Sequence, residues 1–246
     1  MIFANFKAVF DGARMKLPCG IAQTGKAFRN EIAPRNFLFR CREFEQMEIE
    51  YFVKPGEDCP YPIPDVEVKV LAEDWEESKV MSLKDACKEG IICRDWHAYW
   101  LGQSLLWFKN LNCNLENFRI KQHEKEELAH YASDCWDLEY NFPFGWRELQ
   151  GIADRGDFDL SQHQKESKQK LGVYDEETKE RFLPHVVCEP SFGLERSILV
   201  FMYEAYNVNE KGNVVLKLSP KLAPVKAAVF PLMKKGPQAE VARKIF

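Results

Sequence analysis

The sequence predicts an α+β protein, because strand-like and helix-like segments both recur along the chain. The clearest signal is the segment 28–52, where Pro34 and Asn36 separate two runs rich in Phe, Ile and Tyr, as in two strands joined by a loop. Further short strands are predicted at residues 66–70, within 137–159, at 184–189 and at 214–218. Apolar residues at helical spacing predict helices at residues 1–17, 94–110 and 194–206, with shorter ones at 82–89 and 124–130.

Side chains alternate between the two faces of a strand, so the segment 28–52 predicts one polar face and one buried face. Arg29 and Glu31 are expected to point the same way on the first strand. On the second strand, one face is expected to carry Arg40, Arg42, Phe44, Gln46 and Glu48, and the other Met47, Ile49 and Tyr51. Paired antiparallel, the two strands would present arginines, a ring and carboxylates on one side and pack on a core with the other.

The polar face has a chemical meaning. Guanidinium groups bind phosphate oxygens through two parallel hydrogen bonds and stay charged. A neighbouring ring stacks on a flat base, and a carboxylate holds an ammonium group or accepts from an exocyclic amine. The face therefore suits a nucleotide together with a small ligand that carries an amine. The alternative is a surface hairpin with cross-strand salt bridges, each worth about 0–1 kcal/mol.

The order of residues in the segment 28–52 is a more specific guide to function than its charges alone. The segment reads FRNE, then a loop with Pro34 and Arg35, then RCREFEQMEIEYF. This pattern resembles motif 2 of the class II aminoacyl-tRNA synthetases, in the variant of the homodimeric, class IIa glycyl-tRNA synthetases. Two later stretches agree in the same order: ELQGIADRGDFDL at 148–160, and VCEPSFGLER at 187–196, which resembles motif 3. The resemblance covers most of the chain apart from roughly 59–90.

The resemblance implies an organisation. Residues 1–218 would form the catalytic core, a class II synthetase antiparallel β-sheet flanked by helices, with an insertion at about 59–90 that carries the predicted strand and short helix. Residues 219–246 would be a linker and the start of an α/β anticodon-binding domain, with its first strand at 222–232 and its first helix from Pro237. The motif 1 region and most of the anticodon-binding domain are expected to be missing from this sequence, and the intact protein is expected to be a homodimer.

The resemblance also implies a reaction. A glycine–tRNA ligase uses ATP and Mg²⁺ to activate glycine as glycyl-adenylate and transfers it to the 3′ end of tRNA(Gly). Arg29 and Arg196 would be the catalytic residues. Arg29 would clamp the α-phosphate and the glycine carboxylate. Phe44 would stack under adenine, opposite Arg196, which would also contact the terminal phosphate. The other residues expected to bind ATP are Glu31, at the adenine amine, Arg35, at the outer phosphates, Arg40, Arg42, Glu148 and Leu149. Which of Arg40 and Arg42 faces ATP stays open.

The substrate amino acid is expected beside the nucleotide. Glu48, Glu189 and Ser191 would surround the α-ammonium group of glycine, and a pocket closed by such side chains excludes larger amino acids by steric clash. Glu148 would help to hold Mg²⁺ through hard oxygen ligands. The aspartates of the 148–160 stretch are expected to be structural, while His130-Tyr131-Ala132 resembles a family segment beside the active site.

Composition bounds these expectations. The formal net charge is −4, which gives no basic footprint of a nucleic-acid-binding protein; a local basic surface at Lys165, Lys168, Lys170, Lys179 and Arg181 is the alternative to a solvated charge run. Neither a signal peptide nor a membrane span is seen in the sequence, and the eight cysteines form no CxxC pair, so reduced thiols and a cytoplasmic location are expected. A zinc site at Cys59, Cys87, Cys93 and His97 is a minor alternative.

Two other functions compete with the glycine–tRNA ligase. One is a synthetase-like paralogue that keeps the fold, lacks the chemistry and acts as a binding or accessory protein. The other is a class IIa ligase for serine, threonine or proline. Glu48 and the run Glu189-Pro190-Ser191 favour glycine.

Overall fold

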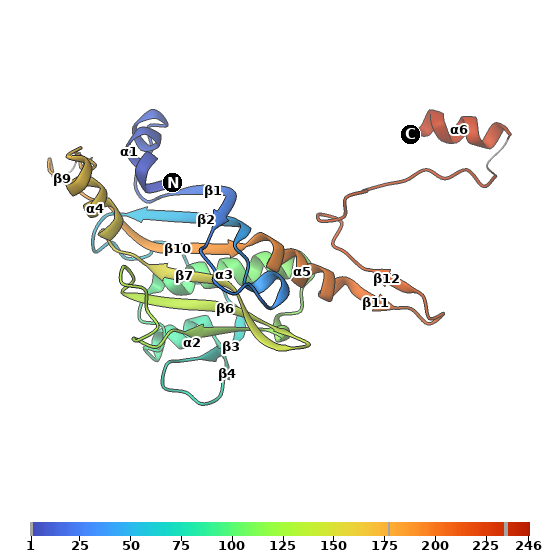
Figure 1. Ribbon diagram of the computed structural model, residues 1–246, viewed down its shortest axis with the longest axis horizontal. Helices are drawn as coiled ribbons and strands as arrows, with labels where there is room; N and C mark the ends of the chain where they lie inside the picture. The colour runs from blue at the N-terminus through green and yellow to red at the C-terminus, as the bar shows by residue number, and fades with distance from the viewer. Residues whose placement is uncertain (1, 177, 234–235) are drawn as a thin grey trace.

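The computed structural model describes residues 2–176, 178–233 and 236–246 and shows an α+β fold, as predicted (Figure 1). Its centre is an eight-stranded sheet with strand order β1-β2-β10-β7-β6-β5-β3-β4. Neighbouring strands are antiparallel except for the parallel pair β3–β5. The strands of this sheet are β1 (Cys19–Phe28), β2 (Glu43–Val53), β3 (Glu67–Leu71), β4 (Lys79–Ser82), β5 (Phe118–Gln122), β6 (Asp134–Phe142), β7 (Gly145–Asp154) and β10 (His185–Gly193).

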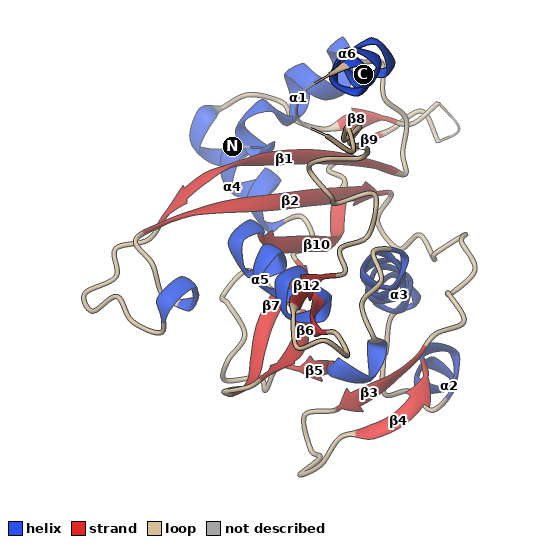
Figure 2. Cartoon of the chain, turned by 90° about the vertical axis from the view of Figure 1, so that its right-hand side faces the viewer, coloured by secondary structure: helices blue, strands red, loops and turns tan. Residues whose placement is uncertain are grey.

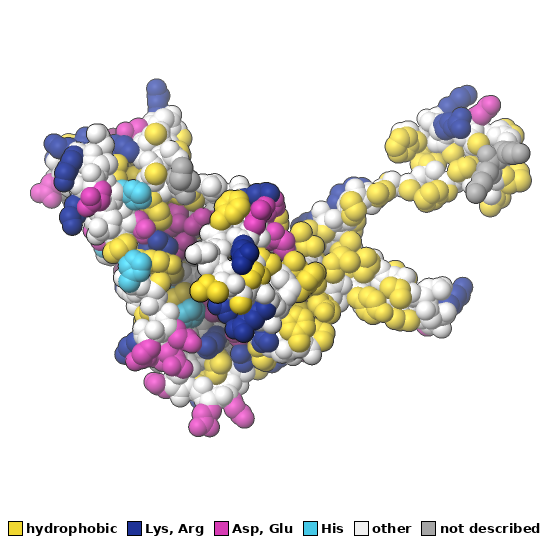
Figure 3. Space-filling model, in the orientation of Figure 1, with side chains coloured by type: hydrophobic (Ala, Val, Ile, Leu, Met, Phe, Trp, Pro, Cys, Tyr) yellow, Lys and Arg dark blue, Asp and Glu magenta, His cyan; other side chains and the backbone are white. Residues whose placement is uncertain are grey.

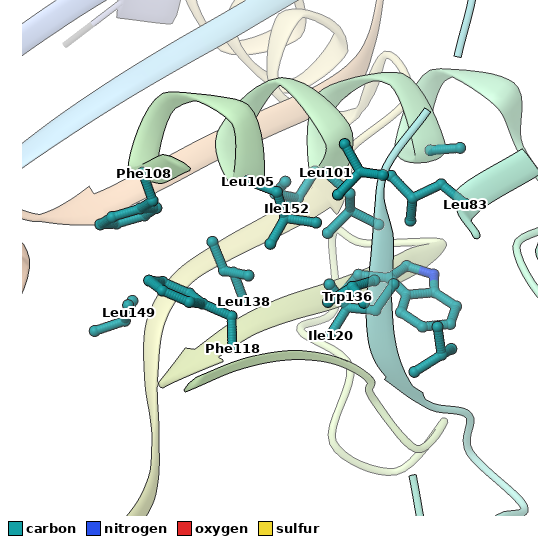
Figure 4. Close-up of a cluster of buried hydrophobic side chains, with 14 of the residues drawn as sticks. Leu83, Leu101, Leu105, Phe108, Phe118, Ile120, Trp136, Leu138, Leu149 and Ile152 are labelled. Carbon is teal, nitrogen blue, oxygen red and sulfur yellow. The ribbon is translucent and has the colours of Figure 1, made fainter. Parts of the chain in front are cut away.

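Helix α3 (Asp95–Asn110) covers one face of the sheet and forms the main core with it. Figure 4 shows Leu101, Leu105 and Phe108 of α3 pointing at side chains of the strands, among them Trp136 and Ile152. These side chains are fully or almost fully buried. The aromatic residues predicted at 94–110 therefore serve mainly the core, since Trp96 and Phe108 are also buried and only Trp107 is substantially exposed.

A second core lies on the opposite face, at one end of the sheet. The strand β2 reverses face at each residue, so Tyr51 packs on Trp96 of α3 while Phe52 packs on Phe6 of helix α1 (Ile2–Gly12), with ring centroids 4.5 Å apart. Helix α4 (Phe158–Ser167) contributes Leu160 to the same cluster. The rest of this face is left open between α1 and the loop that joins β1 to β2.

That loop, with the short 3-10 helix η1 (Phe37–Phe39), lies on the side of the sheet away from α3 (Figure 2). The predicted strand pair is confirmed, but its boundaries differ: β1 ends at Phe28 and β2 begins only at Glu43. Arg29, Glu31, Arg40 and Arg42, which were predicted on the two strands, therefore belong to the connection between them, together with Arg35. Pro34 and the left-handed backbone of Asn36 and Phe37 keep this segment from continuing either strand.

The segment 59–90 extends the sheet at its far edge. Strands β3 and β4 form an antiparallel hairpin, and β3 pairs with β5, so the predicted strand at 66–70 joins the main sheet. Helix α2 (Leu83–Lys88) matches the short helix predicted at 82–89; it begins after Ser82, whose side chain accepts a hydrogen bond from the N–H of Asp85. Val68 and Leu83 are buried in the main core, so the unit folds as part of the sheet.

Three predicted boundaries were wrong. Residues 124–130 form turns and no helix, because they connect β5 to its antiparallel neighbour β6 and carry no continuous apolar stripe. Residues 190–193, predicted as a turn, continue β10 up to Gly193, because both β2 and β7 pair with them. Helix α5 (Leu194–Ala205) then begins as predicted. The third error concerns residues 158–167: the predicted strand region ran to residue 159, but helix α4 begins at Phe158.

The chain after α5 extends away from the sheet (Figure 1). Strands β11 (Tyr206–Val208) and β12 (Val214–Leu216) form a small hairpin. The strand predicted at 222–232 is absent from the described residues of that segment. Helix α6 (Pro237–Ile245) begins where a helix was predicted. Among the residues that the structure describes, no strand lies beside 222–232 to pair with it. Exposed apolar side chains follow this tail (Figure 3), including Val225, Phe230 and Leu232. Within the described residues, no helix has the length and apolar character needed to cross a lipid bilayer.

Gly102 in the middle of α3 provides a test of this core. A Cβ atom placed on Gly102 would lie 2.7–2.9 Å from three atoms of the Pro64 ring, which has little freedom to move. We expect Gly102→Ala to lower the free energy of unfolding by about 1–3 kcal/mol, despite the better helix propensity of alanine. Chemical denaturation measures this. Gly12→Ala, at the open end of α1, is the matched control and should change stability by less than about 0.5 kcal/mol.

Candidate active site

A partly open hollow lies on the open face of the sheet, between η1 and the start of α5. Its walls come from the β1–β2 loop, β2, β7, β10 and α5, which are far apart in the sequence. The predicted residues that line it are Arg29, Glu31, Arg40, Phe44, Glu148, Leu149, Ser191 and Arg196, joined by Phe39, Cys41, Gln46, Phe192, Gly193 and Glu195. In Figure 3 this face shows Lys and Arg side chains beside Asp and Glu.

Two arginine side chains that line the hollow each lie against an aromatic ring. The guanidinium carbon of Arg29 lies 5.3 Å from the centre of the Phe44 ring, and that of Arg196 lies 5.1 Å from the centre of the Phe39 ring. Arg196 also donates hydrogen bonds to the carbonyl oxygens of Glu148 (2.9 Å) and Phe39 (2.8 Å). Phe39 was not predicted, because a Phe in a loop carries no periodic signal.

The close approach of Arg196 depends on the residue that precedes α5. A Cβ atom on Gly193 would lie 3.3–3.4 Å from the side-chain carbons of Arg196. Arg196 stands in the first turn of α5, where the unpaired N–H groups and the helix dipole favour an anion. The sequence order Gly-Leu-Glu-Arg therefore places a cationic side chain and a helix N-terminus on the same wall.

The loop arginines divide into two groups. Arg40 lines the hollow and its Nε lies 2.9 Å from a carboxylate oxygen of Glu31. Arg42 lies outside and donates from Nε to the carbonyl oxygen of Glu31, at 2.9 Å. Arg35 also lies outside the hollow and pairs with Arg40 through the backbone. The structure therefore brings Arg40 to the hollow and uses Arg42 to hold the loop, while the predicted ATP contacts of Arg35 and Arg42 stay predictions.

A β-bulge brings Glu148 to this face. Leu138 of β6 lies opposite Gln150 of β7, but the next residue, Glu139, lies opposite Glu148, so Leu149 is the extra residue. Without the bulge, Glu148 would share the α3 face of the sheet with Gln150. With it, Glu148 shares the open face with Gly151 and reaches the rim of the hollow, 3.4 Å from Arg196 Nη1.

Three carboxylates meet beside the hollow. Oxygen atoms of Glu48, Glu50 and Glu189 all lie within 4.8 Å of one another. Ser191 lies opposite Glu48 in the β2–β10 pairing, and its hydroxyl accepts a hydrogen bond from the Gln46 amide. An adjoining hollow shares Arg29, Gln46, Glu148 and Ser191 with the first and reaches Glu189, so Ser191 and Glu189 line a space that continues from the first hollow. Glu48 lines neither hollow but lies next to Glu189.

Similarity to known proteins agrees with this arrangement. No family model matches the chain. It is 42% identical over 255 residues to the glycine–tRNA ligase of Thermobifida fusca, which covers 99% of this chain and 47% of that protein. It is 46% identical over 238 residues to that of Clostridium beijerinckii, covering 95% of this chain and 44% of the relative. The chain is a relative of the glycine–tRNA ligases. It spans about half the length of the curated relatives that it matches.

The relationship and the mostly antiparallel eight-stranded sheet together confirm the predicted fold class, an α+β fold whose β-sheet, flanked by helices, is that of a class II synthetase. The glycine–tRNA ligases that match include that of Caldanaerobacter subterraneus subsp. tengcongensis, 43% identical over the whole of this chain and 46% of that protein. The resemblance first seen in three short motifs therefore extends over nearly every residue, including 59–90.

In this relative of the glycine–tRNA ligases, the cluster of Glu48, Glu50 and Glu189 has Arg155 as a neighbouring cation. Arg155 donates to Glu189 at 2.6 Å and, with two nitrogens, to Asp159 at 2.7 and 2.9 Å, and it stacks 3.7 Å from the centre of the Tyr131 ring. These hydrogen bonds to carboxylates raise the already high pKa of Arg155 against the effect of burial. This nearly buried cation thus contacts Glu189 and Asp159, while Glu48 and Glu50 lie beside Glu189.

Two of these carboxyl groups, those of Glu189 and Glu50, have raised pKa values. Burial raises the pKa of Glu189 to about 7, with the Glu48 carboxyl adding to the rise and Arg155 opposing it. Burial raises the pKa of Glu50 to about 10, and the charge of Glu189 adds to it. Glu50 is completely buried, and neither carboxyl oxygen has a hydrogen-bond partner among the described residues. Sequence reasoning passed over Glu50 although it lies two residues from Glu48, and therefore on the same face.

The Glu50 carboxyl makes stability depend on pH. Its pKa is higher in the folded chain than the ordinary 4.5, so folding takes up a proton between these values, and stability falls as pH rises. We expect Glu50→Gln to gain stability relative to the parent as pH rises from about 5.5 to about 8.5, by up to about 1.4 kcal/mol per pH unit. Urea denaturation at several pH values measures this. Parallel pH curves for the two proteins would contradict it, and Glu67→Gln, at an exposed residue, is the control.

Proposed function

We propose that this chain binds ATP and glycine and joins them as glycyl-adenylate, the first step of a glycine–tRNA ligase; transfer to the 3′ end of tRNA(Gly) is the second. The observation that carries the proposal is the pair of adjoining hollows that share Arg29, one lined by Arg196 and the other by Glu189 with Glu48 beside it, in a relative of these ligases. Arg29, Arg40 and Arg196 line the first hollow and would bind phosphate groups, and Glu189 lines the adjoining hollow and would bind an ammonium group.

The nucleotide would lie in the first hollow. Phe44 and Arg196 line it from β2 and α5 and would stack on the two faces of adenine, with Glu31 accepting from the adenine amine. Arg29 would leave the Phe44 ring as the base enters and move to the α-phosphate and the glycine carboxylate. Arg40 and, after a movement of the loop, Arg35 and Arg42 would reach the outer phosphates, and Leu149 would pack beneath the nucleotide.

Glycine would lie where the two hollows meet. Its α-ammonium group would take the place between Glu48, Glu189 and the Ser191 hydroxyl, where excess negative charge attracts a cation. Binding of the ammonium group favours the ionised form of Glu189 and so lowers its pKa. A larger amino acid would press its Cβ substituent against these side chains, so the pocket would exclude amino acids larger than glycine by steric clash.

The reaction would then depend on position and charge. The glycine carboxylate oxygen forms a bond to the α-phosphorus, the bond from that phosphorus to the bridging oxygen breaks, and pyrophosphate leaves with both electrons. No proton has to move in this step, so the reaction needs no histidine base, in keeping with a nucleotide hollow lined by arginines. Arg29 would stabilise the charge that builds up on the α-phosphate oxygens.

Magnesium fits the rim of the hollow. Mg²⁺ is held by one or two carboxylates together with substrate phosphates, and the half-exposed carboxylate of Glu148 faces the hollow where the outer phosphates would lie. When bound, the ion would supply charge neutralisation for the leaving pyrophosphate. Glu148 would release Arg196 to nucleotide as it takes up the ion.

The partners are proposed on the same basis. The substrates would be glycine and tRNA(Gly), the intact protein would be a homodimer, and the place of action would be the cytoplasm. Residues 1–218 would form the catalytic core, and 219–246 would lead into an anticodon-binding domain. The exposed side chains of Lys165, Lys168, Lys170, Lys179 and Arg181 on and after α4 would offer tRNA a local basic surface.

Calorimetric titration of the 246-residue chain with a non-hydrolysable glycyl-adenylate sulfamate tests the proposal. We expect saturable binding to one site and at least about tenfold weaker binding of the alanyl analogue, whose extra methyl group clashes. Equal binding of the glycyl and alanyl analogues, or of neither, would contradict the assignment of Glu48 and Glu189. Glycine-dependent exchange of pyrophosphate into ATP is the second readout, and tight analogue binding without exchange would favour a non-catalytic binding role.

A further inference from the structure

Within the part of the chain that the structure describes, two groups bring together three or more side chains that bind metals. One is the glutamate cluster described above. The other consists of His123, Cys135 and Asp137, and neither group includes the predicted zinc candidates Cys59, Cys87, Cys93 and His97. The second group has no part in the proposed chemistry of glycine activation.

The fold places the three side chains together through the β5–β6 pair. His123 follows the last residue of β5, and its N–H donates to the carbonyl oxygen of Cys135 at 3.0 Å, which continues the ladder. Cys135 and Asp137 are two residues apart on β6, so both point to the open face. His123 Nε2 lies 2.8 Å from an oxygen of Asp137, and the ligand atoms of all three lie within 4.8 Å of one another.

The cluster is accessible without being fully exposed. All three side chains are half-buried, and all three line the adjoining hollow, which gives an ion a path from solvent. Gly151 lies opposite Asp137 on β7, where a Cβ atom would come 3.6 Å from the Asp137 carboxylate, so the absence of a side chain leaves space there. Glu127 and Glu148 line the same hollow and add negative charge.

The chemistry of the three ligands selects the kind of ion. Mg²⁺ and Ca²⁺ take oxygen ligands, whereas an imidazole nitrogen, a thiolate and a carboxylate suit Zn²⁺ and similar divalent transition metals. In a tetrahedral zinc site with bonds of about 2.0–2.3 Å, ligand atoms stand roughly 3.3–3.8 Å apart. The present spread needs only small side-chain rotations to reach that geometry.

We propose that His123, Cys135 and Asp137 form a thiolate-containing site for a divalent transition metal of the zinc class, with a fourth position open to the hollow. The ion takes the place of the proton shared by His123 and Asp137 and binds the Cys135 sulfur as thiolate, so binding releases protons. The alternative is an ordinary ion pair between His123 and Asp137 with a cysteine nearby. The proposal needs neither ATP nor glycine and goes beyond the proposed ligase activity.

Titration of the full chain with Co²⁺ under a phosphine reductant tests the site. Co²⁺ bound to a thiolate shows a sulfur-to-metal charge-transfer band, and a tetrahedral site shows intense visible bands. We expect one equivalent with both signatures. Cys135→Ser should abolish the charge-transfer band, and His123→Asn should weaken binding by at least about tenfold, the lower limit seen even for partners of metal ligands.

Cys93→Ser is the matched control, because Cys93 is an exposed cysteine outside the cluster. It should keep the band and the affinity of the parent. Circular dichroism shows that each variant is folded before titration. A charge-transfer band that survives in Cys135→Ser, or one that is absent from the parent, would overturn the proposal, whatever the outcome of the glycyl-adenylate titration.

Discussion

Arg155→Met is expected to lower the free energy of unfolding by about 3–5 kcal/mol at neutral pH, the largest single effect on stability that we predict. Arg155 is almost buried, and it is the cation that hydrogen-bonds to both Glu189 and Asp159. Methionine keeps much of the volume and the contact with the Tyr131 ring but leaves two buried carboxylates without a partner, beside Glu48 and Glu50.

The pH dependence identifies the cause. Without Arg155 the carboxyl groups bind protons more readily, so the loss of stability should shrink as pH falls towards about 4. Denaturant unfolding at neutral and acidic pH measures both values. Arg147→Met, on the exposed end of β7, is the matched control and should cost less than about 0.5 kcal/mol. A loss that is equally large at both pH values would show that Arg155 acts through packing and not through charge.

Glu48→Gln is expected to lower kcat/KM for glycine in pyrophosphate exchange by at least about a hundredfold, or about 2.7 kcal/mol of transition-state binding. The amide keeps the shape of the side chain and removes the charge that would face the glycine ammonium group. The KM for ATP should change by less than about twofold, because Glu48 does not line the nucleotide hollow.

Glu43→Gln is the control for this change. Glu43 begins the same strand, but it is exposed and pairs with Lys26. Its exchange kinetics should match those of the parent. Normal glycine-dependent exchange by Glu48→Gln would contradict the proposed ammonium site while leaving the nucleotide site untouched.

Local periodicity accounts for much of what could be predicted from the sequence. The alternation along β2 correctly placed Phe44 and Glu48 on one face and Tyr51 on the face that packs on α3. The apolar spacing of 94–110 gave α3, and Gly193 with the run that follows gave the start of α5. These features depend on neighbours within a few residues, which a sequence displays directly.

The features that the sequence did not predict depend on contacts between residues that are far apart in the chain. The bulge at Leu149 decides which face Glu148 takes, and no residue type near it signals the extra position. The buried network of Arg155, with partners on α4 and β10, looks in sequence like a set of loop caps. Glu50 was passed over because a carboxylate on a strand is usually solvent-facing, whereas here it is completely buried beside Glu48 and Glu189.

The order of strands has a consequence for how the protein is made. In the sheet, β2 lies between β1 and β10, and residues of β10 that pair with it are about 140 positions later in the chain, as with Ser191 and Glu48. A nascent chain leaving the ribosome therefore exposes Glu48 and Glu50 on an open strand edge until roughly 140 further residues have been synthesised. Such long-range pairing is slow and leaves unpaired edges open to aggregation, so we expect chaperones to hold this hairpin before β10 arrives.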